Sequence, residues 1–408
     1  MTENIRVAHW VPTISLALLL ATASACHYVD QGGKVVPSTS EATSSKVRVS
    51  SATLQKLYSY RETLKAKAPV CHGAYEGQMS ESPTECNEFD TTHFAGYSCY
   101  AAYLAKDVEW ASKRCRDVAV GQDPNTGRWW RGQQNRDKNL QLLAAGQPEG
   151  PDSFSRDMHS GVMIHFTVSG LLNDWDLSEK NAIAPMAKKW VRWIDGDGHD
   201  RLCLSPSDTR CSLYGGASGM MYLVYKRLGA YEAEGTSTTF TSMKNNSNKF
   251  KRFLDGGLGL SFLSELKATP VGFELHLKAA TTLFLHALER SDLLSGRTTS
   301  DFSPDIIPEA WKAIAEKDPE NPYYDFLGNG VSDPSAQRLF DLIDSLTSRS
   351  ASLPYDWLWQ RKWEVNSLGV AMPNSNSSIH DMIFLLNLMI ADANGDWCKA
   401  GQACSNSR

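Results

Sequence analysis

The chain has 408 residues, and its 41 Lys and Arg against 46 Asp and Glu give a formal net charge of -5 at pH 7. This acidic balance argues against a nucleic-acid-binding protein, which would carry a basic excess or a basic stripe. With 21% charged and 42% hydrophobic residues, the composition is that of a globular chain and excludes a largely disordered one.

The first 25 residues have the layout of a secretory signal peptide. Residues 7–25 contain no Asp, Glu, Lys or Arg, a compact apolar run lies at 14–21, and small residues occupy 23–25. A membrane-spanning anchor would need about 20 consecutive apolar residues, and this run is shorter. We therefore predict that residues 1–25 are removed on export.

The residue that follows this leader is a cysteine. Ser24-Ala25-Cys26 resembles the lipobox of bacterial lipoproteins, with Ala23 where that family usually carries Leu. The resemblance implies that Cys26 is acylated, with palmitate among the attached chains, and that the protein is anchored by lipid to a membrane. It also implies a location in the bacterial cell envelope, facing either the periplasm or the surface.

Helical periodicity dominates residues 53–408, and strand-like alternation is nearly absent. The polar, Ser- and Thr-rich stretch at 26–52 before it is interpreted as a flexible tether. About ten to twelve helices in one domain favour an all-α fold, an (α/α) toroid of helical hairpins with disulfide-clipped loops. A two-domain helical protein is the alternative, and segment 233–250 is expected to be a long surface loop. The clearest predicted helices are 94–103, 108–118, 158–172, 182–194, 217–228, 258–267, 273–289, 307–316, 336–348 and 379–391.

Eight cysteines remain besides Cys26, an even number that suits disulfide bonding in an oxidising compartment. No C-x-x-C motif and no Cys/His cluster with zinc spacing occurs, so we expect no metal and no cofactor. The Asp-rich segments 195–200 and 392–396 lack the glycine and glutamate of an EF-hand loop and are interpreted as turns. Because short loops close most easily, the expected disulfides are Cys71–Cys86, Cys99–Cys115, Cys203–Cys211 and Cys398–Cys404.

The most conspicuous candidate site is the segment 153–161, which opens a long apolar helix. It places Arg156, Asp157 and His159 at a helix start, where free N–H groups and the helix dipole favour anions. Asp157 is the leading candidate for a catalytic carboxylate, His159 for a catalytic base, and Arg156 for binding an anionic substrate. The structural alternative is helix capping with a salt bridge between Arg156 and Asp157.

A turn-rich loop at 123–131 carries two Arg that flank two Trp. Trp faces stack on sugar rings, and an Arg guanidinium binds a carboxylate or sulfate through two hydrogen bonds. Packing is the alternative role, since one of the two Trp side chains is expected to fill the core. The candidate substrate-binding residues of this loop are Arg128, Trp129, Trp130 and Arg131.

Three further helix starts carry groups suited to acid–base chemistry. Glu274 is the second candidate catalytic carboxylate, and His276, a candidate substrate ligand, lies on the same turn. A surface pair between Glu274 and Lys278 is the structural alternative. Asp90 is a third catalytic candidate with N-capping as its alternative role. Asp381, beside His380 at the start of the last predicted helix, is a candidate substrate ligand.

The stretches 90–99, 127–131, 153–158 and 273–276 resemble a family of exported bacterial proteins of helical-toroid type. More loosely, the expected architecture resembles the six-hairpin glycosidases and polysaccharide lyases, which build a cleft from helix-start loops. The resemblance implies a carbohydrate-active enzyme, most simply a glycoside hydrolase acting on an anionic or surface polysaccharide with paired carboxylates as acid and base. A polysaccharide lyase and a non-catalytic surface lipoprotein that binds a glycan or a partner protein are the alternatives.

Overall fold

The computed structural model of the chain describes residues 49–68, 91–150, 154–196, 215–230, 238–255, 261–297, 301–303, 305–347, 359 and 379–397. Two compact units divide the chain, Met1–Lys46 and Val47–Arg408, and every described residue belongs to the second. The predicted signal peptide, Cys26 and most of the predicted tether lie outside the described residues. So do Asp90 and six of the eight cysteines expected to pair.

All regular structure in the described residues is helical, which confirms the predicted all-α fold. Fourteen α-helices and one π-helix occur there, and strand pairing is limited to a single bridge between Gln122 and Trp129. The helices are α1 (Ser51–Lys67), α2 (Thr91–Leu104), α3 (Val108–Ala119), α4 (Gln133–Ala144), α5 (Arg156–Thr167), the π-helix η1 (Val168–Leu172), α6 (Leu177–Gly196), α7 (Gly215–Arg227), α8 (Thr238–Leu254), α9 (Phe262–Ala268), α10 (Phe273–Leu294), α11 (Ile306–Lys317), α12 (Pro322–Asn329), α13 (Asp333–Thr347) and α14 (Ile379–Ala393).

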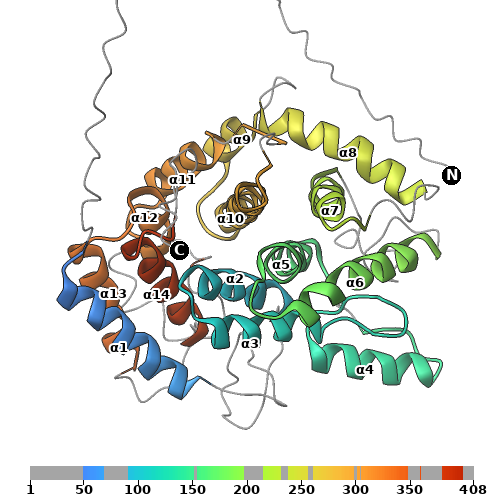
Figure 1. Ribbon diagram of the computed structural model, residues 1–408, viewed down its shortest axis with the longest axis horizontal. Helices are drawn as coiled ribbons and strands as arrows, with labels where there is room; N and C mark the ends of the chain where they lie inside the picture. Colours follow the sequence, from blue (N-terminus) through green and yellow to red (C-terminus); the bar gives the residue numbers. More distant parts are fainter. Residues whose placement is uncertain are drawn as a thin grey trace, which may run out of the picture. The chain divides into compact units, whose positions relative to one another are not determined.

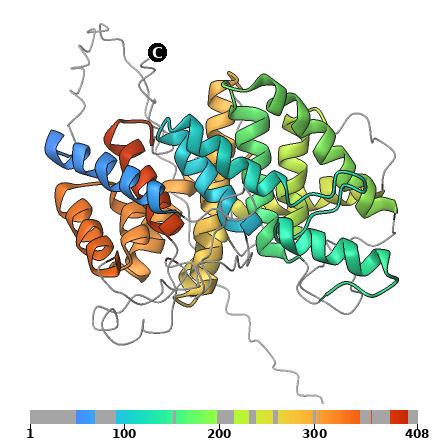
Figure 2. The same cartoon turned by 90° about the horizontal axis from the view of Figure 1, so that it is seen from below.

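Helices that follow one another along the chain pack as hairpins, as α2–α3, α7–α8 and α11–α12 do. In the middle of the second unit, α2 also packs against α5 and α14, and α5 packs against α7 and α10 (Figure 1). The first described helix, α1, lies beside the last, α14, in both views (Figure 2). The centrally packed helices α2, α5 and α10 are the ones whose N-terminal ends carry the candidate site.

The crossing of α2 and α5 depends on two glycines, Gly96 and Gly161. A Cβ atom on Gly96 would overlap the carbonyl of Gly161, and a Cβ atom on Gly161 would overlap the carbonyl of Thr92. Glycine therefore lets the two backbones approach more closely than any other residue would allow. This close approach holds the N-terminal turns of α2 and α5 side by side.

One predicted loop is in fact a helix. Residues 238–254 form α8, so the prediction of a surface loop over 233–250 is wrong for that part of the segment. Met243, Ser247, Phe250 and Leu254 are buried at helical spacing, and Phe250 lies against Gly219 of α7. The sequence of α8 contains many Thr, Ser and Asn residues, so its buried positions do not stand out as a helical pattern.

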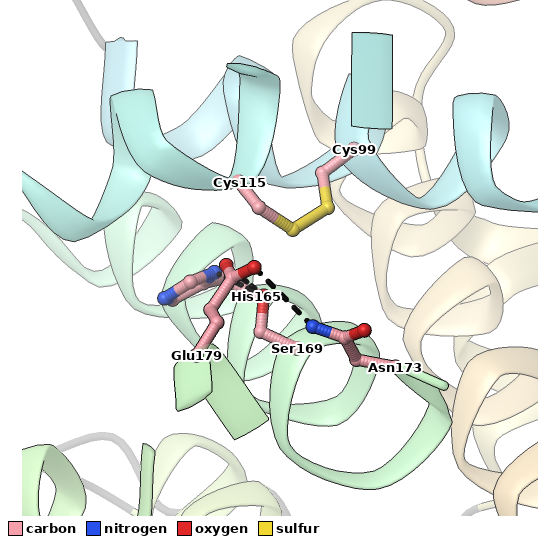
Figure 3. The surroundings of a disulfide bond; sticks show 6 residues. All are labelled: Cys99, Cys115, His165, Ser169, Asn173 and Glu179. Carbon is pink, nitrogen blue, oxygen red and sulfur yellow. Dashed lines mark hydrogen bonds between the residues drawn. A yellow bond between two sulfur atoms is a disulfide. The ribbon is translucent and has the colours of Figure 1, made fainter. Parts of the chain in front are cut away.

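Cys99 of α2 and Cys115 of α3 form a disulfide, which confirms that predicted pair (Figure 3). Both cysteines are fully buried, and the bond joins the two helices of one hairpin. Closing a loop of this length stabilises a folded chain by about 3 kcal/mol. The other three expected disulfides lie outside the described residues.

No helix in the described part of the chain combines the length and the apolar character that crossing a membrane requires.

Candidate functional site

The N-terminal ends of α2, α5 and α10 meet around a buried pair of histidines. His93 lies in the first turn of α2 and His276 in the first turn of α10, and their Nε2 atoms are 3.2 Å apart. His93 Nδ1 lies 2.6 Å from the backbone carbonyl oxygen of Asp157 in the first turn of α5. One side chain therefore connects three helix starts that are far apart in the sequence.

The hydrogen bonds define the tautomers of both rings. Because a carbonyl oxygen only accepts, His93 Nδ1 carries the proton donated to Asp157 and His93 Nε2 is an acceptor. His276 must then donate its Nε2 proton to His93. Ser160 donates to the same Asp157 carbonyl at 2.6 Å, and Tyr97 donates to Ser160 at 2.7 Å. The result is a connected polar network beneath the helix ends.

Burial keeps this network neutral. The pKa of His93 is lowered to about 4, chiefly by burial and to a lesser extent by the Arg131 charge, against an opposing effect of Asp157. Burial and the neighbouring His93 hold the pKa of His276 well below its usual range. The pKa of the Tyr97 hydroxyl is raised well above its usual range, again mainly by burial. Near neutral pH both imidazoles are uncharged, so they orient the helix starts without adding charge to the site.

The half-buried carboxylate of Asp157 lies on the outer side of this network. Ser155, the N-cap residue of α5, donates its hydroxyl hydrogen to Asp157 Oδ1, and its hydroxyl oxygen accepts no backbone N–H of the helix. The guanidinium of Arg131 lies 3.4 Å from the same Ser155 hydroxyl. Arg131 is held there because its carbonyl accepts the backbone N–H of Thr92 at 2.8 Å. The predicted residues Arg131 and Asp157 are thus brought together.

The start of α10 contributes the groups that face solvent. Gly272 has a φ of 109°, a left-handed conformation that favours glycine, and it directs the chain into α10. Glu274 is exposed and makes no hydrogen bond or ion pair with any described residue. Phe273 is 46% exposed, and its ring centre lies 6.4 Å from that of His276. An exposed carboxylate and an exposed aromatic ring therefore stand beside the buried histidine pair.

The loop before α4 does not present the predicted aromatic surface. The sequence predicts that one of the two Trp side chains fills the core, and in the structure both Trp129 and Trp130 are fully buried, so neither candidate offers an exposed face to a sugar. The buried Arg128 guanidinium lies 3.6 Å from the centre of the Trp130 ring and forms an ion pair with Glu149. Burying the two large indole side chains removes much apolar surface from water, so both Trp residues stabilise the core.

Two other predicted residues also lie in the core. His159 follows Asp157 by two residues in the first turn of α5, but it is fully buried and faces Trp190 of α6, so it cannot meet a substrate at the helix starts. Burial lowers the pKa of His159 to about 3. Asp381 of α14 is fully buried, and its backbone carbonyl accepts a hydrogen bond from Trp359. The side chain of Arg156 lies outside the described part of the chain, as does Asp90.

Of the predicted turn at 392–396, Asp392 and Ala393 instead end α14, and the turn itself lies at Asn394 and Gly395. A carboxylate oxygen of Asp392 accepts the backbone N–H of Val331 at 2.7 Å, and Asp396 forms an ion pair with Lys106 at 2.9 Å. These contacts tie the end of α14 to neighbouring segments.

Sequence reasoning passed over His93, Ser160 and Phe273, although all three stand in or beside the segments it singled out. The available signal was the repeated occurrence of a histidine within the first turn of a predicted helix. That signal is weak because the partner of His93 is 183 positions away in the sequence.

No protein-family model matches the chain. Comparison with curated proteins and comparison with solved structures likewise found no match. Any statement about function therefore rests on the residues and geometry of this chain.

Proposed function

We propose that the protein is a carbohydrate-active enzyme, a glycoside hydrolase that acts on an anionic polysaccharide at the starts of α2, α5 and α10. One observation carries the proposal: Asp157 and Glu274 come from the first turns of two helices that the buried His93–His276 pair holds together. Glycoside hydrolysis needs two carboxyl groups, held by a rigid support, one as acid and one as base or nucleophile.

The two carboxylates suit different roles. Asp157 is half-buried and its Oδ1 is oriented by the Ser155 hydroxyl, which suits the base or nucleophile that must approach the sugar in a fixed direction. Glu274 is exposed and has no described partner, which suits a general acid that contacts the leaving oxygen. Phe273 beside it offers an exposed ring for stacking on a sugar face.

The electrostatics of the site favour a negatively charged substrate. Each helix N-terminus carries a partial positive charge, and three such ends meet here. Arg131 adds a full positive charge next to Ser155. The neutral histidine pair adds none, so the selectivity for an anion rests on Arg131 and the helix ends.

The same proposal extends to architecture and location. We infer that the hairpins around α2, α5 and α10 belong to an (α/α) toroid, in which the inner helices present their N-terminal ends on one face. The chain would be exported, processed before Cys26 and anchored by lipid in the bacterial cell envelope. That location would give the enzyme access to polysaccharides of the envelope or the surrounding medium.

The test is a digestion assay with the full chain, purified in detergent under oxidising conditions, on a panel of anionic polysaccharides. New reducing ends are expected for at least one substrate. Asp157→Asn and Glu274→Gln should each lower kcat by about 10²–10⁴-fold. Glu316→Gln, at an exposed glutamate of α11, is the matched control and should leave the rate unchanged.

Three outcomes would contradict the hydrolase. Reducing ends accompanied by the absorbance of an unsaturated uronate would identify a lyase instead. Binding of a polysaccharide without any product, unaffected by Asp157→Asn, would identify a non-catalytic binding lipoprotein. Equal rates in the Asp157→Asn variant and the Glu316→Gln control would place the chemistry elsewhere in the chain.

The two arginines of the loop give a second test of the same site. Arg131→Ala should raise KM for an anionic polysaccharide several-fold with little loss of stability, because Arg131 is only half-buried. Arg128→Ala should instead lower the free energy of unfolding by about 3 kcal/mol, since it leaves the carboxylate of Glu149 buried without its ion-pair partner. Thermal unfolding and Michaelis–Menten analysis of both variants separate the two roles.

A further inference from the structure

A second cluster of chemically reactive side chains lies against the Cys99–Cys115 disulfide, away from the helix starts (Figure 3). Cys115 of α3, His165 of α5 and Glu179 of α6 each offer one ligand atom there: a sulfur, a ring nitrogen and a carboxylate oxygen. These three atoms all lie within 4.8 Å of one another. Cys115 and His165 are fully buried, and Glu179 is partly buried.

A second layer of hydrogen bonds holds the Glu179 carboxylate in place. Ser169 donates to Glu179 Oε1 at 3.0 Å, and the Asn173 side-chain N–H donates to Oε2 at 3.2 Å. The orientation of the Asn173 amide is fixed, because its oxygen accepts the backbone N–H groups of Trp175 and Asp176. Such outer-layer bonds are typical of carboxylates that bind metal ions.

The π-helix η1 is what makes this arrangement possible. It continues α5 from Val168 to Leu172 and carries Ser169, while Asn173 is its C-cap residue. Single π turns within α-helices are rare and occur frequently at functional sites. Here the π turn and the residue after it supply both donors to Glu179.

Only one of the two ring nitrogens of His165 takes part in a hydrogen bond with a described residue. Its Nδ1 lies 3.2 Å from Ser169 Oγ, and the single Ser169 proton already goes to Glu179. Nδ1 must therefore carry the ring proton and donate it, so Nε2 is unprotonated and can only accept a hydrogen bond. Nε2 is buried and has no hydrogen-bond partner among the described residues. A buried acceptor left without a hydrogen-bond partner is costly, so the polar groups of this cluster are incompletely satisfied as they stand.

We propose that reduction of the Cys99–Cys115 disulfide creates a site for one divalent transition-metal ion, bound by Cys115, His165 and Glu179. One thiolate, one imidazole and one carboxylate form a ligand set that suits Zn²⁺ and its spectroscopic substitute Co²⁺. A dithiol reductant supplies two electrons and two protons, and is itself oxidised to a disulfide. The Cys115 thiol then releases its proton to solvent when the sulfur binds the metal.

The disulfide and the metal exclude each other, because a sulfur bonded to Cys99 is not a thiolate ligand. In the oxidised chain the covalent bond joins α2 to α3. In the reduced chain the ion would join α3, α5 and α6 instead. The site would therefore replace one cross-link by another when the redox conditions change.

The decisive variant is Cys99→Ser in the full chain, since it frees Cys115 without any reductant. Titration with Co²⁺ in reductant-free buffer should give one bound ion per chain with a thiolate-to-cobalt charge-transfer band, which Zn²⁺ then removes. The oxidised wild-type chain should show no band. Adding His165→Gln or Glu179→Gln to Cys99→Ser should weaken binding at least tenfold, and adding Cys115→Ser should abolish the band. Adding Cys398→Ser together with Cys404→Ser removes another expected pair without leaving a free thiol, and this matched cysteine control should change nothing.

Circular dichroism establishes that each variant is folded. A folded Cys99→Ser chain without the band overturns the proposal, and so does a band that survives Cys115→Ser. Should Cys99→Ser fail to fold, wild-type chain reduced with a phosphine replaces it. Because the phosphine also reduces the other expected disulfides, the readout is the difference made by His165→Gln: a weaker band in that variant is expected, and a band that His165→Gln leaves unchanged overturns the proposal.

Discussion

The two buried histidine clusters of this protein differ in how their polar atoms are satisfied. At the helix starts, both nitrogens of His93 have partners, Asp157 on one side and His276 on the other. At the disulfide, His165 Nδ1 has a partner, whereas its buried Nε2 has no hydrogen-bond partner among the described residues. A ring with both nitrogens engaged, such as His93, is suited to hold other groups in place, whereas a ring with one nitrogen unengaged, such as His165, has capacity for a ligand. We therefore infer that the first cluster positions the helix starts and that the second binds a ligand.

Forcing α2 and α5 apart should cause the largest loss of stability and activity at the first cluster. Gly161→Ala places a Cβ atom against the backbone of Thr92 and His93, so the helices must separate. Overpacking of this kind costs about 1–3 kcal/mol or more, and here the backbone itself must move. We expect at least 3 kcal/mol loss in urea unfolding together with loss of hydrolysis.

Gly216→Ala is the control, because a Cβ atom there meets nothing within 4 Å. Because Gly216 lies in α7 and Ala has the higher helix propensity, the variant's free energy of unfolding should equal that of the wild type or exceed it by up to about 1 kcal/mol. Equal stability of the Gly161 and Gly216 variants would contradict the role given to the close approach.

Acid should destabilise the protein through its buried neutral histidines. The folded-state pKa values of about 4 for His93 and about 3 for His159 lie below the ordinary 6.5, so the unfolded chain binds more protons between these values. The stability that the two neutral histidines contribute is fully present above pH 6.5 and is lost as the pH falls toward 4. In that range each histidine should lower the free energy of unfolding by about 1.4 kcal/mol for each pH unit of acidification.

Urea unfolding at pH 7 and pH 5 measures this slope. Glu289 acts in the opposite direction, since burial and the nearby Asp292 and Asp305 raise its pKa to about 7. The informative quantity is therefore the difference between wild type and His159→Phe. A shallower loss of stability in His159→Phe is expected, and an identical slope would show that His159 is not buried neutral.

The independence of the two clusters can be tested through Ser169→Ala. Loss of this hydroxyl removes one donor to Glu179 and the partner of His165 Nδ1, so stability should fall by about 1–2 kcal/mol. Cobalt binding in the Cys99→Ser background should weaken about tenfold. Hydrolysis should keep its wild-type kcat, and a parallel loss of kcat would mean that the clusters are coupled.

The smallest effect is expected for Phe273→Ala. Because the ring is 46% exposed, its removal should change the free energy of unfolding by less than about 0.5 kcal/mol. Loss of one stacking contact should raise KM for a polysaccharide several-fold, since aromatic stacking is worth about 1 kcal/mol. Leu293→Ala, at an exposed apolar site at the far end of α10, should leave KM unchanged.

Local signals in the sequence determined the helical class, the Cys99–Cys115 pair and several helix starts. The predicted start at Phe273 coincides with the start of α10, and the predicted start at Ile379 with that of α14. Periodicity and short loop closure act between residues that are near one another in the chain, so they can be read without a fold.

The tertiary structure alone decided which helix starts meet and which aromatic residues are exposed. Trp129 and Trp130 became core residues, whereas the ring of Phe273 is exposed. His93 and His276, 183 positions apart, became partners, and η1 brought Ser169 toward Glu179. Such choices depend on the sum of burial and hydrogen bonding over the whole body, and no local pattern contains that sum.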